Sequence, residues 1–297
     1  MTFKRILRYG MTGSDVRYIR DLLLSLGYGP VGYSDVSGNV FDEAMLAAVK
    51  QFQRANLDLD GKQLFVDGIV GQKTWDAIVR APVIERDTSL PATIGKLAGM
   101  ALTPALARVS DPRRAFMLLA LQFAYDPTVP AKYPHSLYIR GGNLYHTDLA
   151  LNVITAARID AGAKRQPAYY SNGRAEMMKA AVANNPGISG ADCSGGIVGL
   201  LRKFALVRPT FDTIANALTG DRYSVAVSQD ALLPGDYVGR PGHIGLYAGG
   251  GYVVEWMGGA YGCQLSILDD RRGYNFVSGR TVAKAPWTKF RRPDVFA

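Results

Sequence analysis

Cysteine and histidine are scarce in this chain of 297 residues, which contains two of the first and three of the second. A chain of this length buries a core without disulfides, so a disulfide-stapled scaffold is excluded. Two of the histidines, His135 and His146, are eleven residues apart and have no ordered carboxylate or thiol spacing around them. This arrangement falls short of a zinc signature. We therefore expect neither a bound metal nor another cofactor.

Long apolar runs are also missing, and none approaches the length of a membrane-spanning helix. The basic start of the chain, residues 1–8, is not followed by the apolar stretch of a signal peptide. The sequence alone therefore predicts no integral membrane segment and shows no targeting signal.

One cysteine and one histidine lie in local settings suited to nucleophilic catalysis. Cys193 follows a turn-forming segment and opens a run whose apolar residues recur at helical spacing. Its sulfur is expected at a helix N-terminus, where the helix dipole favours the thiolate. His243 opens an alternating run typical of a strand, and its imidazole is a candidate general base. Because pairing with Cys263 would remove this nucleophile, we interpret Cys263 as a free packing residue in a sheet.

A carboxylate is expected beside this histidine. The three glycines at 249–251 indicate a hairpin, and residues 252–257 alternate again as its return strand. The hairpin places Glu255 across from His243, to within about one residue of register, where it would orient the imidazole. Taken singly, each of these residues has an ordinary structural interpretation. Their joint placement at a helix start, a strand start and the partner strand favours a catalytic set.

Three short motifs around these residues occur in the order and spacing of one enzyme family. They are Asp-Cys-Ser-Gly at 192–195, Leu-Pro-Gly-Asp-Tyr-Val at 233–238 and His-Ile-Gly-Leu-Tyr at 243–247. This part of the chain resembles the NlpC-type cell-wall peptidases, papain-like enzymes that cut peptidoglycan stem peptides. The resemblance implies a Cys-His-polar triad whose third member is Glu255, where many members have histidine. It also implies a covalent acyl-enzyme, with the oxyanion held by backbone N–H groups after Ser194.

The resemblance extends to the substrate side of the site. The family carries a Tyr-x-aromatic-Gly-Gly element, and residues 138–142, Tyr-Ile-Arg-Gly-Gly, are similar to it with arginine in place of the aromatic residue. By this resemblance Tyr138, Asp192 and Ser194 face the substrate. About fifty residues separate the element from the cysteine, so residues 143–189 are interpreted as an insertion on the substrate side. Trp256 is assigned to the same groove, although it fits the core equally well, as do Tyr169 and Tyr170.

The first eighty residues resemble a different module. Residues 14–26 and 41–52 carry apolar residues at helical spacing, and residues 66–79 weakly repeat the approach to the second helix. The run Asp-Gly-x-x-Gly-x-x-Thr-Trp at 67–75, together with Phe52-Gln53, is similar to the signature of a small three-helix peptidoglycan-binding module. The resemblance implies an N-terminal domain that binds the bacterial wall.

These patterns predict an α+β protein with two modules. Residues 1–80 are the peptidoglycan-binding domain, residues 81–110 a Pro-bounded linker with a candidate helix from 94 to 109, and residues 111–297 the catalytic domain. By resemblance the catalytic domain has the papain-like NlpC-type fold, in which the helix that bears the cysteine packs on an antiparallel sheet.

The most specific function that the resemblance implies is a peptidoglycan hydrolase that cuts the bond between D-glutamate and the diamino acid. Two alternatives stay open: an N-acetylmuramoyl-L-alanine amidase on the same fold, and a wall-binding protein with an inactive catalytic domain. The formal net charge of +9 favours anionic partners. Because the basic residues are scattered and no nucleic-acid module is recognised, we expect peptidoglycan and not nucleic acid. We expect a monomer that acts on the cell wall, either as a phage endolysin or as a secreted enzyme.

Overall fold

The computed structural model describes residues 2–26, 28, 38–56, 58–60, 62–80, 89–148, 151 and 153–296. The chain divides into two compact units. The first consists of residues 1–87, 110–115 and 201–209, and the second of residues 88–109, 116–200 and 210–297. The first part of the predicted linker, residues 81–88, lies outside the described residues.

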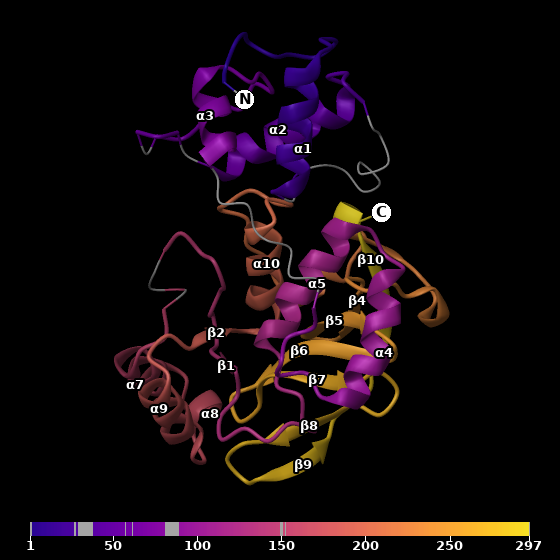
Figure 1. The fold of residues 1–297 in the computed structure, drawn as a ribbon. Coiled ribbons are helices and arrows are strands. Elements are labelled where there is room, and N and C mark those ends of the chain that lie inside the picture. The colour runs from indigo at the N-terminus through magenta and orange to yellow at the C-terminus, as the bar shows by residue number, and fades with distance from the viewer. Residues whose placement is uncertain are drawn as a thin grey trace. The chain divides into compact units, whose positions relative to one another are not determined.

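Three helices make up the N-terminal module within the described residues of the first unit (Figure 1). They are α1 (Ser14–Ser25), α2 (Glu43–Ala55) and α3 (Gln72–Arg80). The apolar faces of the helices meet in one core that includes Ile19, Phe52 and Trp75. Asp42 begins α2, because its carboxylate accepts a hydrogen bond from the Met45 backbone N–H at 2.8 Å. The expected small helical module is therefore present.

The weak internal repeat is visible in the burial pattern of this module. The same set of positions is buried at the start of α2 and at the start of α3: Phe41, Met45, Ala48 and Val49 in the first, and Val70, Thr74, Ala77 and Ile78 in the second. A residue two or three positions before each helix also forms an isolated bridge with the N-terminal segment, Val40 with Thr12 and Val70 with Leu7. Each repeat thus contributes one helix and one short pairing to the same core.

A buried glutamine explains part of the module's sequence signature. The Gln53 side chain of α2 is 1% exposed. It accepts a hydrogen bond from the Gly68 N–H at 2.8 Å and donates one to the Ile69 carbonyl at 2.9 Å. Gly68 has a φ of +77°, and a Cβ there would collide with Leu46, so glycine is required. Leaving the buried amide of Gln53 unpaired would cost about 1–3 kcal/mol.

A six-stranded antiparallel sheet forms the centre of the second unit, in the order β3-β10-β4-β5-β6-β7. The strands are β3 (Ser224–Ala226), β4 (Tyr237–Arg240), β5 (His243–Gly249), β6 (Tyr252–Gly258), β7 (Gly262–Ile267) and β10 (Lys289–Pro293). Strands β8 (Arg272–Asn275) and β9 (Arg280–Ala283) form a separate hairpin. The β5–β6 pair is the hairpin that the three glycines predicted.

Helix α4 (Lys96–Ala107) occupies the segment for which the sequence predicted a helix, and α5 (Asp111–Phe123) follows it. Helix α4 packs against the β5–β6 turn so closely that a Cβ at Gly249 would lie 2.4 Å from the Ala105 side chain. Gly249 also has a φ of +99°, so both its backbone and its surroundings require glycine. The turn that connects the proposed histidine and glutamate strands is thereby held in place.

The 143–189 segment contains three helices among its described residues: α7 (Ala156–Arg165), α8 (Pro167–Tyr170) and α9 (Arg174–Asn184). They share an apolar core with β1 (Ser136–Tyr138), in which Leu137, Ile159 and Met178 are buried. Strand β1 pairs in parallel with β2 (Ser189–Ala191), so the two ends of this segment lie side by side. Two further short elements are α11 (Ala215–Leu218) and the 3-10 turn Gln229–Ala231.

Helix α10 (Cys193–Lys203) packs on the central sheet through a glycine. A Cβ at Gly196 would lie 2.4 Å from the Trp256 ring of β6, so only glycine permits this approach. The chain is therefore of mixed α+β class, with the cysteine-bearing helix against an antiparallel sheet. No helix of the described residues is long and apolar enough to cross a membrane.

Candidate active site

Cys193 is the first residue of α10, and its neighbour Asp192 caps the helix. The Asp192 carboxylate accepts hydrogen bonds from the Gly195 N–H at 2.8 Å and from the Ser194 hydroxyl at 3.1 Å. A second oxygen of the same carboxylate accepts the Gly141 N–H at 3.0 Å. Because a carboxylate satisfies the free N–H groups of the first turn, the helix starts at the cysteine. The position expected for the nucleophile, at a helix N-terminus, is confirmed.

His243 and Glu255 are brought together by the hairpin. Leu246 pairs with Val254, and continuing this register places Glu255 opposite Gly245, two positions from His243 on the same face of the sheet. The side chains meet diagonally, and His243 Nε2 lies 2.7 Å from Glu255 Oε2. The register differs from direct opposition, yet the two residues contact each other as the sequence predicted.

The Glu255 carboxylate is fully buried and has more partners than the sequence revealed. Arg271 donates from Nη2 to Oε2 at 2.6 Å and from Nε to Oε1 at 3.0 Å. The Ser266 hydroxyl donates to Oε1 at 2.6 Å. Burial by itself raises the pKa of Glu255, but the hydrogen bonds from His243 and Arg271 outweigh it and lower the pKa to about 2. Glu255 is therefore ionised throughout the neutral range.

Trp287 packs against both side chains that flank this carboxylate, His243 and Arg271. Its ring stacks on the His243 imidazole, with centroids 5.5 Å apart and planes inclined by 9°. The Arg271 guanidinium carbon lies 4.4 Å from the same indole centroid. Trp287 is 7% exposed, so the indole both shields the His243–Glu255 contact from water and restricts rotation of the imidazole.

The Cys193 thiol is buried and protonated in this structure. Burial raises its pKa to about 11, and the charge of Asp192 adds to this, while nearby backbone N–H groups act in the opposite direction. The Sγ atom lies 3.9 Å from the Gly242 carbonyl oxygen, toward which the thiol donates. The N–H groups at the helix start do favour the thiolate, as the sequence predicted, but burial outweighs them. The free energy lost by removing a charged sulfur from water exceeds the free energy gained from hydrogen bonds with the N–H groups of one helix turn.

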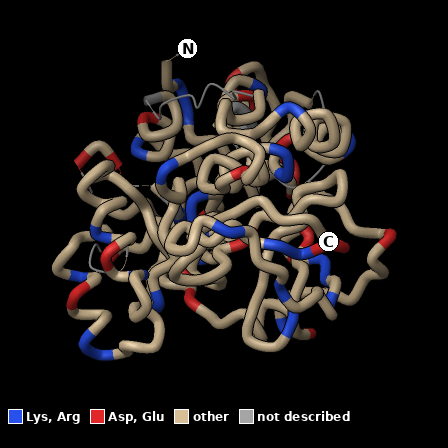
Figure 2. The backbone as a smooth tube through the Cα atoms, turned by 90° about the horizontal axis from the view of Figure 1, so that it is seen from below, with Lys and Arg blue, Asp and Glu red and all other residues tan. Residues whose placement is uncertain are grey.

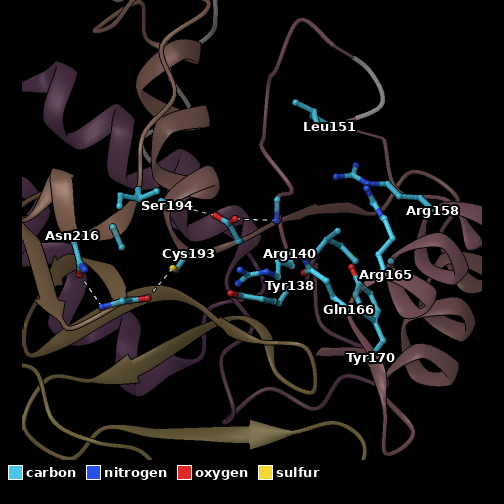
Figure 3. A pocket seen from close by; sticks show the side chains of 17 residues that line it. Tyr138, Arg140, Leu151, Arg158, Arg165, Gln166, Tyr170, Cys193, Ser194 and Asn216 are labelled. Atoms are coloured by element: carbon cyan, nitrogen blue, oxygen red, sulfur yellow. Dashed lines mark hydrogen bonds between the residues drawn. The ribbon is translucent and has the colours of Figure 1, made fainter. Parts of the chain in front are cut away.

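A cavity of about 720 Å³ opens beside the thiol (Figure 3). Its wall includes Cys193, Ser194, Asp192 and Tyr138, so the structure places three of the four predicted substrate residues around the nucleophile. The Tyr138 hydroxyl is largely buried, and burial together with the neighbouring Cys193 raises its pKa. Asn216 holds the loop before His243, because its Oδ1 accepts the Gly242 N–H at 2.8 Å.

The fourth predicted substrate residue, Trp256, does not line this cavity. Its side chain is 0% exposed, and its Nε1–H donates to the Ser136 hydroxyl at 3.1 Å. Trp256 lies under α10 at Gly196 and belongs to the core, so its assignment to the groove was wrong. Its apolar ring fills the interface between the helix and the sheet, and its single polar atom finds a partner there.

The structure points to other oxyanion donors than those that the sequence predicted. The N–H groups of Gly195 and Gly196, which follow Ser194, both donate to Asp192, the first to its side chain and the second to its carbonyl at 3.0 Å. They are not available to a substrate. The backbone N–H groups of Ile244, Ser194 and Cys193 all lie close enough to the sulfur to lower its pKa, and those of Cys193 and Ser194, at the start of the helix, are the candidates.

The remaining cysteine and histidines lie away from this chemistry. Cys263 is a fully buried free thiol in β7, as its interpretation as a packing residue requires. His135 stacks on Tyr125, and His146 accepts the Asp148 N–H at its Nδ1. Within the described ranges no three His, Cys, Asp or Glu side chains are grouped as a metal site would need.

Sequence reasoning missed Arg271, Ser266 and Trp287. Arg271 is one of several charged residues in a turn, and nothing in its spacing relates it to Glu255. Ser266 did carry a signal: it and Gln264 are polar residues at buried positions of β7, the strand beside Glu255. Buried polar side chains on a strand indicate a hydrogen-bonded partner on the neighbouring strand.

Comparison with known families gives a match for the N-terminal module. Residues 12–78 match a family model described as "Putative peptidoglycan binding domain". The N-terminal module is a peptidoglycan-binding domain. This domain implies cell-wall association and supports peptidoglycan as a partner of the chain. No curated protein and no solved structure matches the chain.

Lys and Arg are interspersed with Asp and Glu along the described chain (Figure 2).

Proposed function

We propose that the second unit is a cysteine peptidase that hydrolyses stem-peptide amide bonds of peptidoglycan. In this proposal Cys193 is the nucleophile, His243 the general base and Glu255 the carboxylate that orients the imidazole. The contact of 2.7 Å between His243 Nε2 and Glu255 Oε2 carries the proposal, because it leaves Nδ1 as the ring nitrogen that can take a proton. The peptidoglycan-binding domain of the same chain supports the wall as the source of substrate.

The mechanism begins with a protonated thiol. A pKa of about 11 means that Cys193 does not form a standing thiolate in the free protein. When substrate fills the cavity, the cysteine rotates away from the Gly242 carbonyl and gives its proton to His243 Nδ1 as Sγ attacks the amide carbon. The carbonyl oxygen becomes an oxyanion that accepts hydrogen bonds from the Cys193 and Ser194 N–H groups.

Two further steps complete the reaction. The tetrahedral intermediate collapses, the C–N bond breaks, and the imidazolium of His243 protonates the departing amine. Water then attacks the thioester carbon while His243 takes its proton, and collapse releases a carboxylic acid and the thiol. Throughout, the Glu255 carboxylate keeps the ring in the tautomer and orientation that these proton transfers need.

The resemblance of residues 192–195, 233–238 and 243–247 to the NlpC-type peptidases refines the proposal. It supports a papain-like arrangement for the second unit and the D-glutamyl–diamino acid bond as the bond cut. A lytic enzyme of the endolysin type is the biological function that fits a wall-binding domain joined to such a peptidase.

Digestion of purified peptidoglycan, followed by mass analysis of the released muropeptides, tests this function. An endopeptidase exposes a new amino group on the diamino acid and leaves L-alanyl-D-glutamate on the glycan. An amidase would instead release intact stem peptides and peptide-free glycan. If wild type and Cys193→Ala give the same muropeptides, the second unit is not a hydrolase and the chain is a wall-binding protein.

A further inference from the structure

One wall of the cavity beside Cys193 is built by α7 and carries two arginines. Arg158 and Arg165 are seven residues apart, which places them on one face of the helix about 10 Å from each other along its axis. Both side chains line the cavity, while Cys193 and Asn216 stand on its opposite side (Figure 3). Arg140 and Tyr138 lie between the two walls.

The packing of α7 determines that these side chains meet the cavity. Ile159, next to Arg158, is fully buried in the core shared with β1 and α9. Gly162 lies against the ring of Tyr170, where a Cβ would approach within 2.6 Å of that ring. The Thr155 hydroxyl caps the helix by accepting the Arg158 N–H at 3.1 Å. The rotation of α7 about its axis is therefore fixed.

The arginines of this wall form no ion pair within the described residues. No described carboxylate lies at ion-pair distance from Arg140, Arg158 or Arg165. The acidic residue on the described lining is Asp192, whose carboxylate already accepts hydrogen bonds from Gly141, Ser194 and Gly195. Burial lowers the pKa of Arg158 and the nearby charge of Arg165 acts in the same direction, while Tyr170 and Asp148 oppose them. Three arginines thus face the cavity without a carboxylate at ion-pair distance.

Arginine clusters of this kind recognise carboxylates, because a guanidinium matches a carboxylate with two parallel hydrogen bonds. A separation of about 10 Å between Arg158 and Arg165 is about three times the rise of one extended residue, so it suits two carboxylates spaced along an extended peptide better than one single anion. We propose that Arg158 and Arg165, together with Arg140, form an anion-recognition subsite that selects stem peptides with free carboxyl groups over the same peptides with carboxamides.

This inference rests on the proposed function, since it names the substrate form of the same site. Its test uses two synthetic stem peptides that differ only in whether the D-glutamyl α-carboxyl and the diamino-acid carboxyl are free or amidated. Binding to the full chain carrying Cys193→Ala is measured by calorimetry, so the readout does not need catalysis. We expect the carboxylate peptide to bind at least tenfold more tightly than the carboxamide peptide.

Substitutions in α7 test which residues give the preference for the carboxylate peptide. Arg165→Gln in the same background should weaken binding of the carboxylate peptide about tenfold and leave the carboxamide peptide unchanged. Arg158→Lys keeps the charge and should weaken binding of the carboxylate peptide less. The matched control is Lys164→Gln, which removes an equal charge from the neighbouring position of α7, outside the described lining of the cavity. It should bind both peptides as the parent does.

Several results would overturn the subsite. They are equal affinity for the two peptides, equal effects of Arg165→Gln and Lys164→Gln, or a tighter Arg165-dependent complex with a glycerol-phosphate oligomer than with the peptide. Failure of the proposed function is recognised separately. If wild type never cleaves the carboxylate peptide but binds it in an Arg165-dependent way, the subsite stands and the peptidase does not.

Discussion

Arg271 and His243 hold the same carboxylate from two directions. Arg271 donates to both oxygens of Glu255, and the His243 ring lies 2.7 Å from Oε2. The charge of Glu255 is therefore already balanced when His243 takes a proton. In a fully buried pair of this kind the arginine offsets the desolvation of the carboxylate, and the carboxylate in turn orients the imidazole. The base His243 is thus positioned by Glu255, which is itself held by Arg271.

Arg271 is accordingly expected to matter both for stability and for turnover. Arg271→Gln leaves a buried carboxylate without its main partner, and we expect a loss of about 3–5 kcal/mol in the free energy of unfolding. The acidic limb of the pH profile of kcat/KM should move to higher pH, because an imidazolium beside an unbalanced carboxylate holds its proton more strongly. Urea unfolding and steady-state kinetics measure both effects.

A matched control lies next in sequence. Arg272 is exposed and pairs with Asp270, so Arg272→Gln removes the same charge without touching Glu255. Its free energy of unfolding should stay within about 0.5 kcal/mol of wild type, and its pH profile of kcat/KM should equal that of wild type. Indistinguishable behaviour of the two variants would remove Arg271 from the site.

Glu255 makes stability depend on pH at the acidic end. Its pKa in the folded chain is about 2, against an ordinary value of 4.5. A depressed pKa contributes stability that is present above pH 4.5 and is lost as the pH falls toward 2, here about 3 kcal/mol. Glu255→Gln should therefore be less stable than wild type at neutral pH, and the gap should narrow between pH 4.5 and 2. A gap that is constant with pH would contradict the depressed pKa.

The nucleophile is tested by replacement and by labelling. Cys193→Ala and Cys193→Ser should abolish wall lysis while leaving the fold and peptidoglycan binding intact. Iodoacetamide should label Cys193, which is 7% exposed and borders the cavity, much faster than the fully buried Cys263. Tryptic mass mapping of the alkylated chain gives the ratio of labelling at Cys193 to labelling at Cys263. Equal labelling together with retained lysis in Cys193→Ala would reject the assignment.

The protonation of the thiol has its own pH signature. With a pKa of about 11, the alkylation rate of Cys193 should keep rising with pH above 9 in the free protein. Asp192→Asn retains a helix cap but removes a negative charge, so its alkylation curve should lie at lower pH. The exposed Asp230→Asn serves as the charge control and should leave the curve in place. A plateau at neutral pH in wild type would show a standing thiolate instead.

The N-terminal domain should bind walls on its own. A fragment that ends near Arg80 retains the core around Ile19, Phe52 and Trp75, and we expect it to sediment with insoluble peptidoglycan. Gly68→Val in the same fragment forces a side chain into Leu46 at a positive φ, and it should lose helical circular dichroism and binding together. A folded wild-type fragment that stays in the supernatant with several wall types would contradict the binding function.

Local patterns predicted the parts of the site that belong to one element each. The start of α10 at Cys193, the strand that begins at His243 and the glycine hairpin before Glu255 all follow from short-range periodicity and turn chemistry. The diagonal contact between His243 and Glu255 follows from the same hairpin, since it depends on only twelve residues of chain.

What the sequence did not reveal depends on contacts between distant elements. Arg271 reaches Glu255 from the turn before β8, and Trp287 covers both from the segment before β10. Trp256 was misassigned because an aromatic residue on a strand fits a groove or a core equally well until the opposite helix is known. The raised pKa of Cys193 likewise reflects burial beneath surrounding loops, which no local pattern encodes.

The chain leaves the site after Gly142 and returns to it at Asp192, and the Asp192 N–H donates to the Gly142 carbonyl at 3.1 Å. The parallel pairing of β1 with β2 holds the same two strands together. The ends of the segment between them are therefore held together by backbone hydrogen bonds, and its helices share an apolar core with β1. Because the entropy of closing a loop grows only with the logarithm of its length, the segment can be shortened, extended or exchanged at little entropic cost, provided that the core with β1 is kept. The preference of the cavity for its ligand is thus separable from its chemistry, and α7 with its arginines is open to replacement by transplanting one contiguous stretch of chain.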